Sequence, residues 1–406
     1  MAKRVSVSRG LARAGLLVCF MGSAGQALAQ PAVAVQWQRN EVSVAPQFDL
    51  IDPEYSQTRA RAVWVDSAGS LWLAKVDRDT GMYDPPDGKG TLVDADAMTT
   101  ADLKLVGNGP EWLGTAGLDQ IVYTKFVPGR PHTRPNARLA LAVQQADGSW
   151  THRFLGNAAR NAPYASSDPD DATPRISYVD SLGNHYWREV ADAQTETLVG
   201  AYPQSFYSMR FVRGQRAAVF LAPAADGTQQ VHRYWLDTQV LEQITTDGGH
   251  DETTNVPWMW QAPDFGDRFL VAALVDGDRE LRVYAQLDPA LPVWSVVYTA
   301  REPSGGTLGS PEPFVYDGKS YLFMHASAGS ETNPSRIYLS NVDAAAPMFA
   351  QLTPDSPRRS RRDPEVFVTR TGPKIYYSRI VPPDGACSGC SEGVFMTDPG
   401  LGTAAR

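Results

Sequence analysis

Short apolar stretches, in which apolar and polar residues alternate, recur along the chain and are separated by tight turn signals. Residues 314–316, for example, lead into Asp317-Gly318 and then into a second apolar stretch over residues 320–324. Glycine after aspartate supplies the positive φ that a two-residue hairpin turn requires. Helical periodicity is nearly absent, and the best candidate is a short polar stretch over residues 94–102. The pattern predicts an all-β protein built from successive β-hairpins.

Internal repeats indicate how these hairpins are organised. The sequence Gln243-Ile244-Thr245, followed by Pro257-Trp258, matches Gln351-Leu352-Thr353, followed by Pro364-Glu365. The two copies lie 108 residues apart, which corresponds to two repeats of about 54 residues. The dipeptide Pro-Glu also recurs before Trp112, before Pro313 and before Val366. Repeats of this length are typical of the four-stranded blades of a β-propeller.

The repeats place one candidate innermost strand in each blade. These strands are expected to begin near Arg61, Glu111, Arg175, Met209, Trp258, Glu312 and Glu365. Their mean spacing of about 51 residues suits a four-stranded blade, so we predict a single β-propeller of seven blades. Six blades remain an alternative, because the 34 residues between Arg175 and Met209 are few for four strands. Residues 34–37 are expected to supply the strand that closes the ring onto the last blade.

The amino-terminal residues match a signal peptide. Four basic residues, the last of them Arg13, accompany an apolar stretch over residues 14–21, and Ala27-Leu28-Ala29 offers the small residues that signal peptidase requires. We predict cleavage after Ala29, so that residues 1–29 are the signal peptide and residues 30–406 the propeller domain. The mature protein is then expected in the periplasm or outside the cell. No later run approaches the roughly 18 apolar residues of a membrane-spanning helix.

The mature chain is acidic. The predicted signal peptide contains four of the 37 basic residues and none of the 45 acidic ones, which leaves a net charge of −12. Such a surface disfavours nucleic acid and anionic membranes. We therefore expect a monomer whose partner is an oligo- or polysaccharide or a protein of the cell envelope.

Two cysteines remain after Cys19 is removed with the signal peptide. Cys387 and Cys390 are separated by two residues, and in an oxidising compartment this spacing predicts a short local disulfide. A haem attachment site would require histidine at the position of Ser391, and a zinc site would require a second pair of ligands nearby. Haem, nucleotide and flavin motifs are absent from the sequence. A divalent cation held by residues of several blades remains possible.

Two families are similar to parts of the chain. The Gln-[Ile/Leu]-Thr strand, a polar loop and then proline before an aromatic-rich strand resemble the repeats of TolB-type propellers. Asp363-Pro364-Glu365-Val366-Phe367 resembles a blade of furanosidase-type glycoside hydrolases such as family 43, which implies Asp363 as a catalytic candidate. That family has its Asp-Pro strand in the first blade, whereas this copy lies in the last. Asp52-Pro53 lies in the first-blade region, but without the matching strand pattern.

The loops on one face of the predicted propeller contain candidate acid and base groups. His250, Asp251 and Glu252 place an imidazole beside two carboxylates, which together could exchange protons near neutral pH or bind a cation. A solvated turn of ordinary polar residues is the alternative. The basic cluster over residues 358–362 could anchor an acidic sugar through Arg361 and Arg362. Its alternative is a solvated loop whose arginines pair with neighbouring acidic residues.

The strand-entry positions supply a second candidate set. Glu111, Glu312 and Glu365 begin their predicted strands equivalently and could surround the central axis. Carboxylates that converge there are costly unless they bind a cation, pair with arginine or share protons for acid–base chemistry. The alternative is that Pro-Glu is only a device for strand entry. Trp112 and Trp258 offer flat faces for sugar rings, or else belong to the blade core.

Two classes of function are compatible with these observations. The first is a carbohydrate-active enzyme, either a glycosidase or a polysaccharide lyase, that works in a cleft on the loop face. The second is a non-catalytic periplasmic binding or scaffold propeller of TolB type. Two carboxyl groups facing each other across a site would favour the glycosidase, and a flat or sealed face would favour the scaffold.

Overall fold

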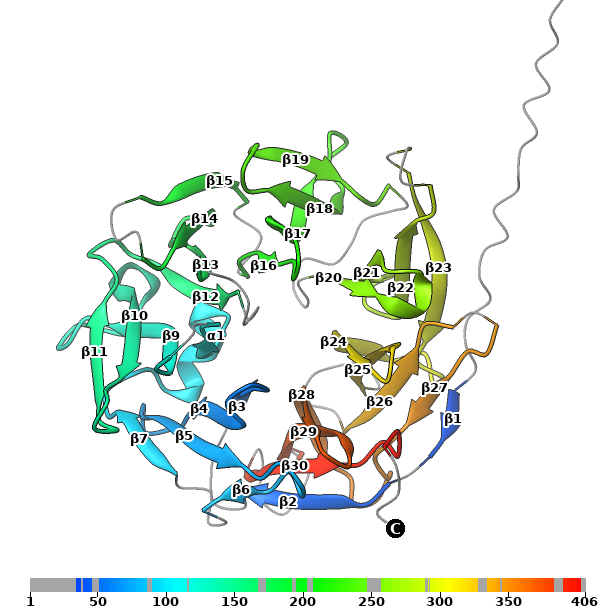
Figure 1. Ribbon diagram of the computed structural model, residues 1–406, viewed down its shortest axis with the longest axis horizontal. Helices are drawn as coiled ribbons and strands as arrows, with labels where there is room; N and C mark the ends of the chain where they lie inside the picture. Colours follow the sequence, from blue (N-terminus) through cyan, green and yellow to red (C-terminus); the bar gives the residue numbers. More distant parts are fainter. Residues whose placement is uncertain are drawn as a thin grey trace, which may run out of the picture.

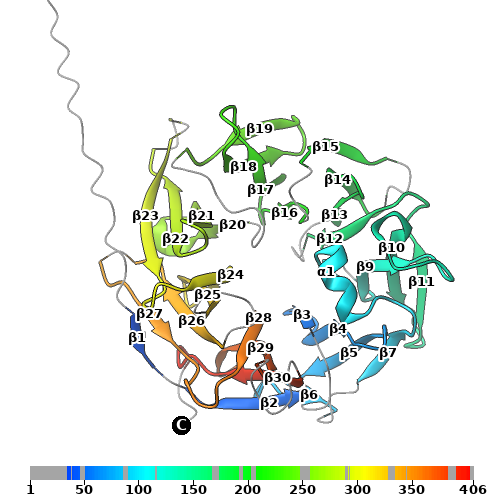
Figure 2. The same ribbon diagram turned by 180° about the vertical axis from the view of Figure 1, so that it is seen from behind.

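The computed structural model describes residues 34–402 except 38, 46–50, 86–89, 115–116, 167–172, 192–194, 203–206, 247–256, 289–290, 292, 328–333, 344 and 383–389. These residues form a ring of seven antiparallel sheets around a central axis, as Figures 1 and 2 show. The prediction of an all-β propeller with seven four-stranded blades is therefore confirmed. No helix in the described part of the chain is long and apolar enough to cross a membrane.

Each blade has its innermost strand next to the axis. The seven innermost strands, from the first blade to the seventh, are β3 (Ile51–Ser56), β8 (Glu111–Trp112), β12 (Asn161–Ala165), β16 (Arg210–Phe211), β20 (Trp258–Ala262), β24 (Thr307–Tyr316) and β28 (Ser360–Thr369). The second strands are β4 (Arg61–Val65), β9 (Gln120–Phe126), β13 (Arg175–Val179), β17 (Ala217–Pro223), β21 (Arg268–Val275), β25 (Lys319–Ser327) and β29 (Gly372–Ile380).

The outer half of each blade is built in the same manner. The third strands are β5 (Leu71–Val76), β10 (Ala137–Gln144), β14 (Asn184–Glu189), β18 (Gln229–Trp235), β22 (Glu280–Gln286), β26 (Ser335–Asn341) and β30 (Ser391–Thr397). The outermost strands are β6 (Tyr83–Asp84), β11 (Trp150–Phe154), β15 (Thr197–Ala201), β19 (Val240–Gln243), β23 (Trp294–Arg301), β27 (Phe349–Gln351) and, in the seventh blade, β2 (Glu41–Ala45).

The remaining elements are short additions to this plan. They are β1 (Ala34–Gln36), which pairs in parallel with β27, β7 (Thr91–Asp94), which pairs with β5, the helix α1 (Leu103–Val106) and the 3₁₀ turns η1 (Thr100–Asp102), η2 (Arg134–Asn136) and η3 (Pro263–Phe265). The helical stretch expected over residues 94–102 is thus displaced towards residue 106. The hairpin turn predicted at Asp317-Gly318 is present, and its two residues have φ values of 50° and 69°.

Two predicted innermost strands were wrong. Arg61 and Arg175 begin the second strands β4 and β13, and the innermost strands of those blades, β3 and β12, lie upstream of them. Each of these innermost strands contains a proline within a bulge, which hides its alternating pattern. The correction also removes the argument for six blades, because the start of the third innermost strand moves from residue 175 to residue 161.

Apolar side chains fill the spaces between neighbouring blades. At the junction of the first and last blades, Trp64 stacks on Tyr83 at a centroid distance of 5.6 Å, and both side chains are buried with Tyr376 and Phe367. Similar clusters lie between the other blades. Because each sheet packs on two neighbours, the core is a ring rather than a single layer.

The ring is closed by β2, which pairs with β30, and not by residues 34–37 as expected. Glu41 on β2 accepts two hydrogen bonds from Arg361, at 2.7 and 2.9 Å, and a third from the Tyr377 hydroxyl at 3.0 Å. Arg361 is 1 % exposed and Glu41 is 5 % exposed. This charged pair explains why β2 closes the ring, because Glu41 at the start of β2 has a partner in the last blade. Ala34–Gln36 has no charged side chain and lies along the sixth blade.

Candidate functional site

One side chain from each innermost strand lies at an equivalent position near the axis. These residues, here called the axial ring, are Glu54, Glu111, Tyr164, Arg210, Trp258, Glu312 and Glu365. Six of the seven follow a proline, the exception being Arg210. Four glutamates from the sixth, seventh, first and second blades therefore face a tyrosine, an arginine and a tryptophan from the third, fourth and fifth.

A repeated backbone device directs four of these side chains. The residue before the proline has a positive φ of 62° at Asp52, 51° at Ala162, 47° at Ser310 and 47° at Asp363. The strand register shifts by one residue at each of these places. A bulge inserts an unpaired residue, and proline is tolerated there because it has no N–H to pair. The bulge thus re-aims the side chain that follows the proline.

The expectation that all three glutamates begin their strands was wrong for Glu312 and Glu365. Glu111 does begin its strand, but Glu312 and Glu365 lie in the middle of ten-residue strands, after the bulge. The motif therefore positions a carboxyl group within an existing strand. The first-blade sequence Asp52-Pro53-Glu54 also adopts this geometry in an innermost strand, so the expectation that it lacks the matching strand pattern was wrong.

Arg210 is the cation of the axial ring. Its guanidinium carbon lies 4.0 Å from the ring centroid of Trp258 and 4.3 Å from that of Tyr164. Its Nη2 lies 3.3 Å from the Tyr164 hydroxyl and 3.7 Å from Oε1 of Glu312. Its Nε is buried and has no hydrogen-bond partner among the described residues. Two aromatic faces thus hold a positive charge beside the glutamates.

Two of the carboxyl groups on the acidic side have fixed hydrogen-bond partners. The Asn108 amide donates to Oε1 of Glu111 at 2.8 Å and to the Pro163 carbonyl at 2.6 Å. The backbone N–H of Gly109 donates to Oδ2 of Asp52 at 2.7 Å. These contacts tie the loop before the second blade to the first and third blades, and they orient both carboxyl groups.

Burial raises the pKa values of the four glutamates of the axial ring. Desolvation raises the pKa of Glu111 to about 8, although the Asn108 hydrogen bond and the charge of Arg210 oppose the change. Desolvation likewise raises the pKa of Glu312 to about 7, against the pull of Arg210. The pKa values of Glu54 and Glu365 are raised well above normal by burial and then by neighbouring carboxylates. Around neutral pH the axial ring therefore contains both protonated and ionised carboxyl groups.

The raised pKa values predict how stability depends on pH. A carboxyl group with a higher pKa in the folded chain binds its proton more tightly there, so it stabilises the fold at low pH, and this stabilisation is lost as pH rises. For Glu111 and Glu312 the loss extends from the ordinary pKa of 4.5 up to about 8 and about 7. We expect the midpoint of thermal unfolding to fall by about 2–4 °C between pH 5.5 and pH 8.5, measured by calorimetry.

The double variant Glu111→Gln and Glu312→Gln is the control, because it has no proton to lose at either position. It should show a flatter dependence on pH over the same interval. Carboxyl groups with lowered pKa values, such as Asp94 and Glu196, lose their stabilisation only below their ordinary range and so lie outside this interval. A midpoint that rises with pH in the natural sequence would contradict the prediction.

The structure brings together several predicted site residues and separates others. Glu111, Glu312, Glu365 and Trp258 meet in the axial ring, and Asp363 lies two residues before Glu365 in the bulge of β28. Trp112 packs in the core between the first two blades and donates its Nε1–H to the Glu54 carbonyl at 3.0 Å. For Trp112 the blade-core alternative therefore holds.

The arginine cluster has a different role from the one expected. Arg361 directs Nε and both Nη groups to protein acceptors and is buried against Glu41, so it offers no free face to an acidic sugar. Arg362 donates from Nε to Ser360 Oγ at 3.2 Å. Burial and then the charge of Arg362 lower the pKa of His325 to about 4. Arg361 does pair with an acidic residue, as the alternative expected, but it is buried in β28 and not in a solvated loop.

Some predicted residues lie outside the described part of the chain. These are His250, Asp251, Glu252 and Cys387. Cys390 is described and is disulfide-bonded. Within the described ranges no group of three or more His, Cys, Asp or Glu side chains is arranged to hold a metal ion. The Cys387–Cys390 pairing and the divalent cation remain predictions.

Sequence reasoning set Asp52 aside and did not identify Glu54, Tyr164 or Arg210. A signal for the first three was present, because Asp52-Pro53-Glu54 repeats Asp363-Pro364-Glu365, and Ala162-Pro163-Tyr164 repeats the proline followed by the axial side chain. Arg210 follows methionine in place of proline, so only its spacing from the other axial positions could have identified it.

Comparisons with known proteins report on the fold. No family model and no curated protein matches the chain. The solved β-propeller domain of Myceliophteria thermophila Cps50 (Swd1) is similar over 88 % of this chain and 97 % of its own, with a TM-score of 0.50 and 9 % identity. At this identity the likeness supports the propeller fold alone.

Two further solved structures match more loosely. TolB from Acinetobacter baumannii is 16 % identical over 83 % of this chain and 78 % of its own, with a TM-score of 0.37. A prolyl endopeptidase is 11 % identical over 82 % of this chain, with a TM-score of 0.46, and the match spans 47 % of that protein's length. Neither similarity extends the argument beyond the fold.

Proposed function

We propose that this protein is an exported carbohydrate-active hydrolase whose acid and base groups are carboxyl groups of the axial ring. The observation that carries the proposal is the convergence of four largely buried glutamate side chains with one arginine near the axis, where burial raises the pKa of Glu111 and Arg210 favours the ionised form of Glu312. Glycoside hydrolysis requires this combination, because one carboxylic acid protonates the leaving oxygen while a carboxylate acts on the opposite side of the sugar.

Glu111 is the candidate acid. Its pKa of about 8 leaves it protonated at neutral pH, and the Asn108 amide fixes one of its oxygens at 2.8 Å. Glu312 is the candidate base, because Arg210 lies 3.7 Å away and favours its ionised form. The two side chains come from the second and sixth blades, which approach the axis from different sides of the ring (Figure 1).

The proton transfers assign a role to each group. Glu111 donates its proton to the glycosidic oxygen as the bond from that oxygen to the anomeric carbon breaks. Water supplies a hydroxyl group to the anomeric carbon, and its remaining proton goes to Glu312. Proton exchange with solvent then restores both groups, and partial exposure of Glu312 and Arg210 gives solvent access to this region.

The charge of the axial ring favours a neutral glycoside as substrate. Burial keeps most of the five carboxyl groups, counting Asp52, protonated near neutral pH, so the remaining carboxylate charge and Arg210 nearly balance and the axial ring offers no excess positive charge to an acidic sugar. One face of Trp258 is already occupied by Arg210. Sugar recognition at the axis would therefore depend on hydrogen bonds to the carboxyl groups more than on stacking.

A panel of neutral 4-nitrophenyl glycosides tests the proposal. The mature protein should release 4-nitrophenol from at least one pyranoside or furanoside near neutral pH. If no member of the panel is hydrolysed while sugars still bind in a manner that depends on the axial ring, the protein is a binding propeller of TolB type and the enzymatic proposal fails.

A further inference from the structure

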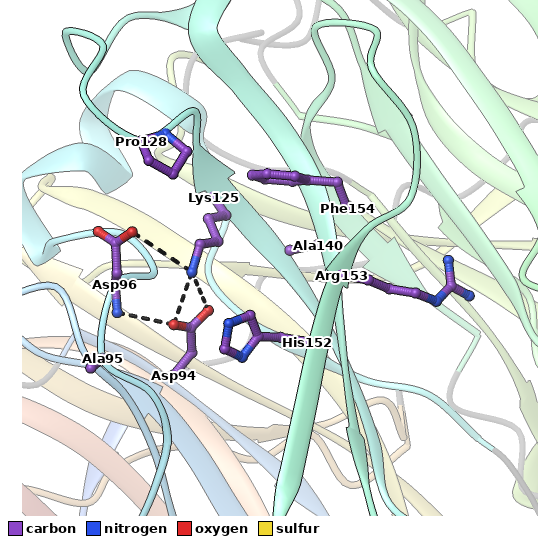
Figure 3. A pocket seen from close by; sticks show the side chains of 9 residues that line it. All are labelled: Asp94, Ala95, Asp96, Lys125, Pro128, Ala140, His152, Arg153 and Phe154. Atoms are coloured by element: carbon purple, nitrogen blue, oxygen red, sulfur yellow. Dashed lines mark hydrogen bonds and ion pairs between the residues drawn. The ribbon is translucent and has the colours of Figure 1, made fainter.

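A separate pocket lies on the outer part of the second blade, where β7 of the first blade meets β9, β10 and β11 (Figure 3). Its volume is about 470 Å³, within the usual range of about 300–1,000 Å³ for small-molecule sites. No axial residue lines the pocket. The axial residues lie on the innermost strands, whereas β11 is the outermost strand of its blade. The proposed chemistry at the axis therefore leaves it unexplained.

The polar floor of the pocket is the ion pair of Lys125 and Asp94, whose opposite charges cancel. Lys125 Nζ lies 2.6 and 2.9 Å from the two carboxylate oxygens of Asp94, and both side chains are buried. Asp94 also accepts from the Tyr123 hydroxyl and from the backbone N–H of Asp96. Its carboxylate is therefore saturated, whereas the Asp96 carboxylate lies 3.8 Å from Lys125 and is 72 % exposed.

The opposite wall is made of ring side chains above small residues. Phe154 lies opposite Ala140 in the strand register, and His152 lies opposite Ala142. Residues two apart on a strand point to the same face, and Figure 3 shows both rings on the side where Lys125 and Asp94 lie. Ala140 lines the pocket and its small side chain leaves space there, and Phe154 is held by packing against the core between the first two blades.

These features select a class of ligand. Lys125 balances Asp94, and the remaining lining charges, Asp96 and Arg153, are of opposite sign, so the pocket favours no net charge. It combines one flat apolar wall with hydrogen-bond donors and acceptors on the facing side. A ligand that matches both is a neutral ring with one apolar face and hydroxyl groups at its edge. We propose that this pocket binds the pyranose ring of a neutral sugar, independently of any catalysis at the axis.

Saturation-transfer NMR with methyl glucoside, methyl galactoside and methyl mannoside tests this inference. We expect at least one sugar to receive magnetisation from the natural protein, and its affinity to fall by about tenfold or more in Phe154→Ala and His152→Ala. His152 is exposed, so its replacement should leave the fold intact. Thr151→Ala on the same strand is the matched control, because Thr151 is exposed and does not line the pocket.

The variant Glu111→Gln distinguishes sugar binding at this pocket from sugar binding at the axial ring. Sugar binding at the pocket should persist in that variant, whereas binding at the axis should persist in Phe154→Ala and His152→Ala. Absence of saturation transfer from all three sugars would overturn the inference. Equal affinity in the natural protein and in both pocket variants would also overturn it. Benzoate, an anionic ring, is the comparison ligand, and binding of benzoate without binding of any sugar would overturn the inference as well.

Discussion

Glu111→Gln is expected to lower kcat for hydrolysis of a neutral glycoside by about 10²–10⁴-fold, because an amide cannot give a proton to the leaving oxygen. The natural protein should show a bell-shaped dependence of kcat/KM on pH. Glu312 must be ionised and Glu111 protonated, so the rate should fall below about pH 7 and again above about pH 8. The measurement is the initial rate with the best substrate of the 4-nitrophenyl panel, across this range.

Glu189→Gln is the matched control for that variant, since it makes the same change on β14 of the third blade, away from the axial ring. Its rate should equal that of the natural protein. In Glu111→Gln the alkaline limb of the pH profile should disappear together with most of the activity. An unchanged rate, or a retained alkaline limb, would exclude Glu111 as the acid.

Glu41→Gln is expected to lower the free energy of unfolding by about 3–5 kcal/mol, because it leaves the buried guanidinium of Arg361 without its counter-charge. Arg379, 3.5 Å from Glu41, would lose the same counter-charge, and the amide would leave one acceptor oxygen in place of two for Arg361 and the Tyr377 hydroxyl. Calorimetry should show the loss as a lower unfolding temperature. Hydrogen exchange should show faster opening of β2 and β30, since the pair holds the strand that closes the ring.

Asp79→Asn offers a matched comparison at the same junction. Asp79 of the first blade pairs with Arg370 of the last through two contacts of 2.8 Å, but the two side chains are 58 % and 67 % exposed. Exposed pairs contribute about 0–1 kcal/mol, so this variant should be nearly as stable as the natural protein. Equal losses in the two variants would show that burial of the Glu41–Arg361 pair is not the cause.

The blade repeat could be predicted from the sequence because it depends on local signals. Aspartate-glycine turns and recurring Pro-Glu dipeptides report strands and spacings within one blade, and they were sufficient for the seven-bladed ring. The strands β3 and β12 were not predicted, because a bulge that contains proline interrupts the alternation of apolar and polar residues that identifies a strand. The same bulge is what aims Glu54 and Tyr164, so the missed strands and the missed site residues have one physical cause.

The remaining features depend on contacts between distant parts of the chain. Nothing near Arg361 in the sequence indicates that its partner is Glu41, 320 residues away. Arg210 is likewise defined by Trp258 and Tyr164 from neighbouring blades. The pKa of Glu111 is raised by burial and by the charges of Asp52 and Glu312 from other blades, and its sequence neighbour Asn108 only opposes this rise, so no local pattern could give the raised pKa.

The closing strand also sets an order of events during synthesis. β2 is made early, yet its partner β30 begins at Ser391, about 350 residues later. At about 5–20 residues per second the early strand would wait roughly 20–70 s before its partner exists. Throughout that interval the first blade has no seventh neighbour and the growing ring has two open ends. Both open ends present unpaired strand edges on which another chain can pair, so fast folding of the last blade would shorten the period in which the chain can aggregate.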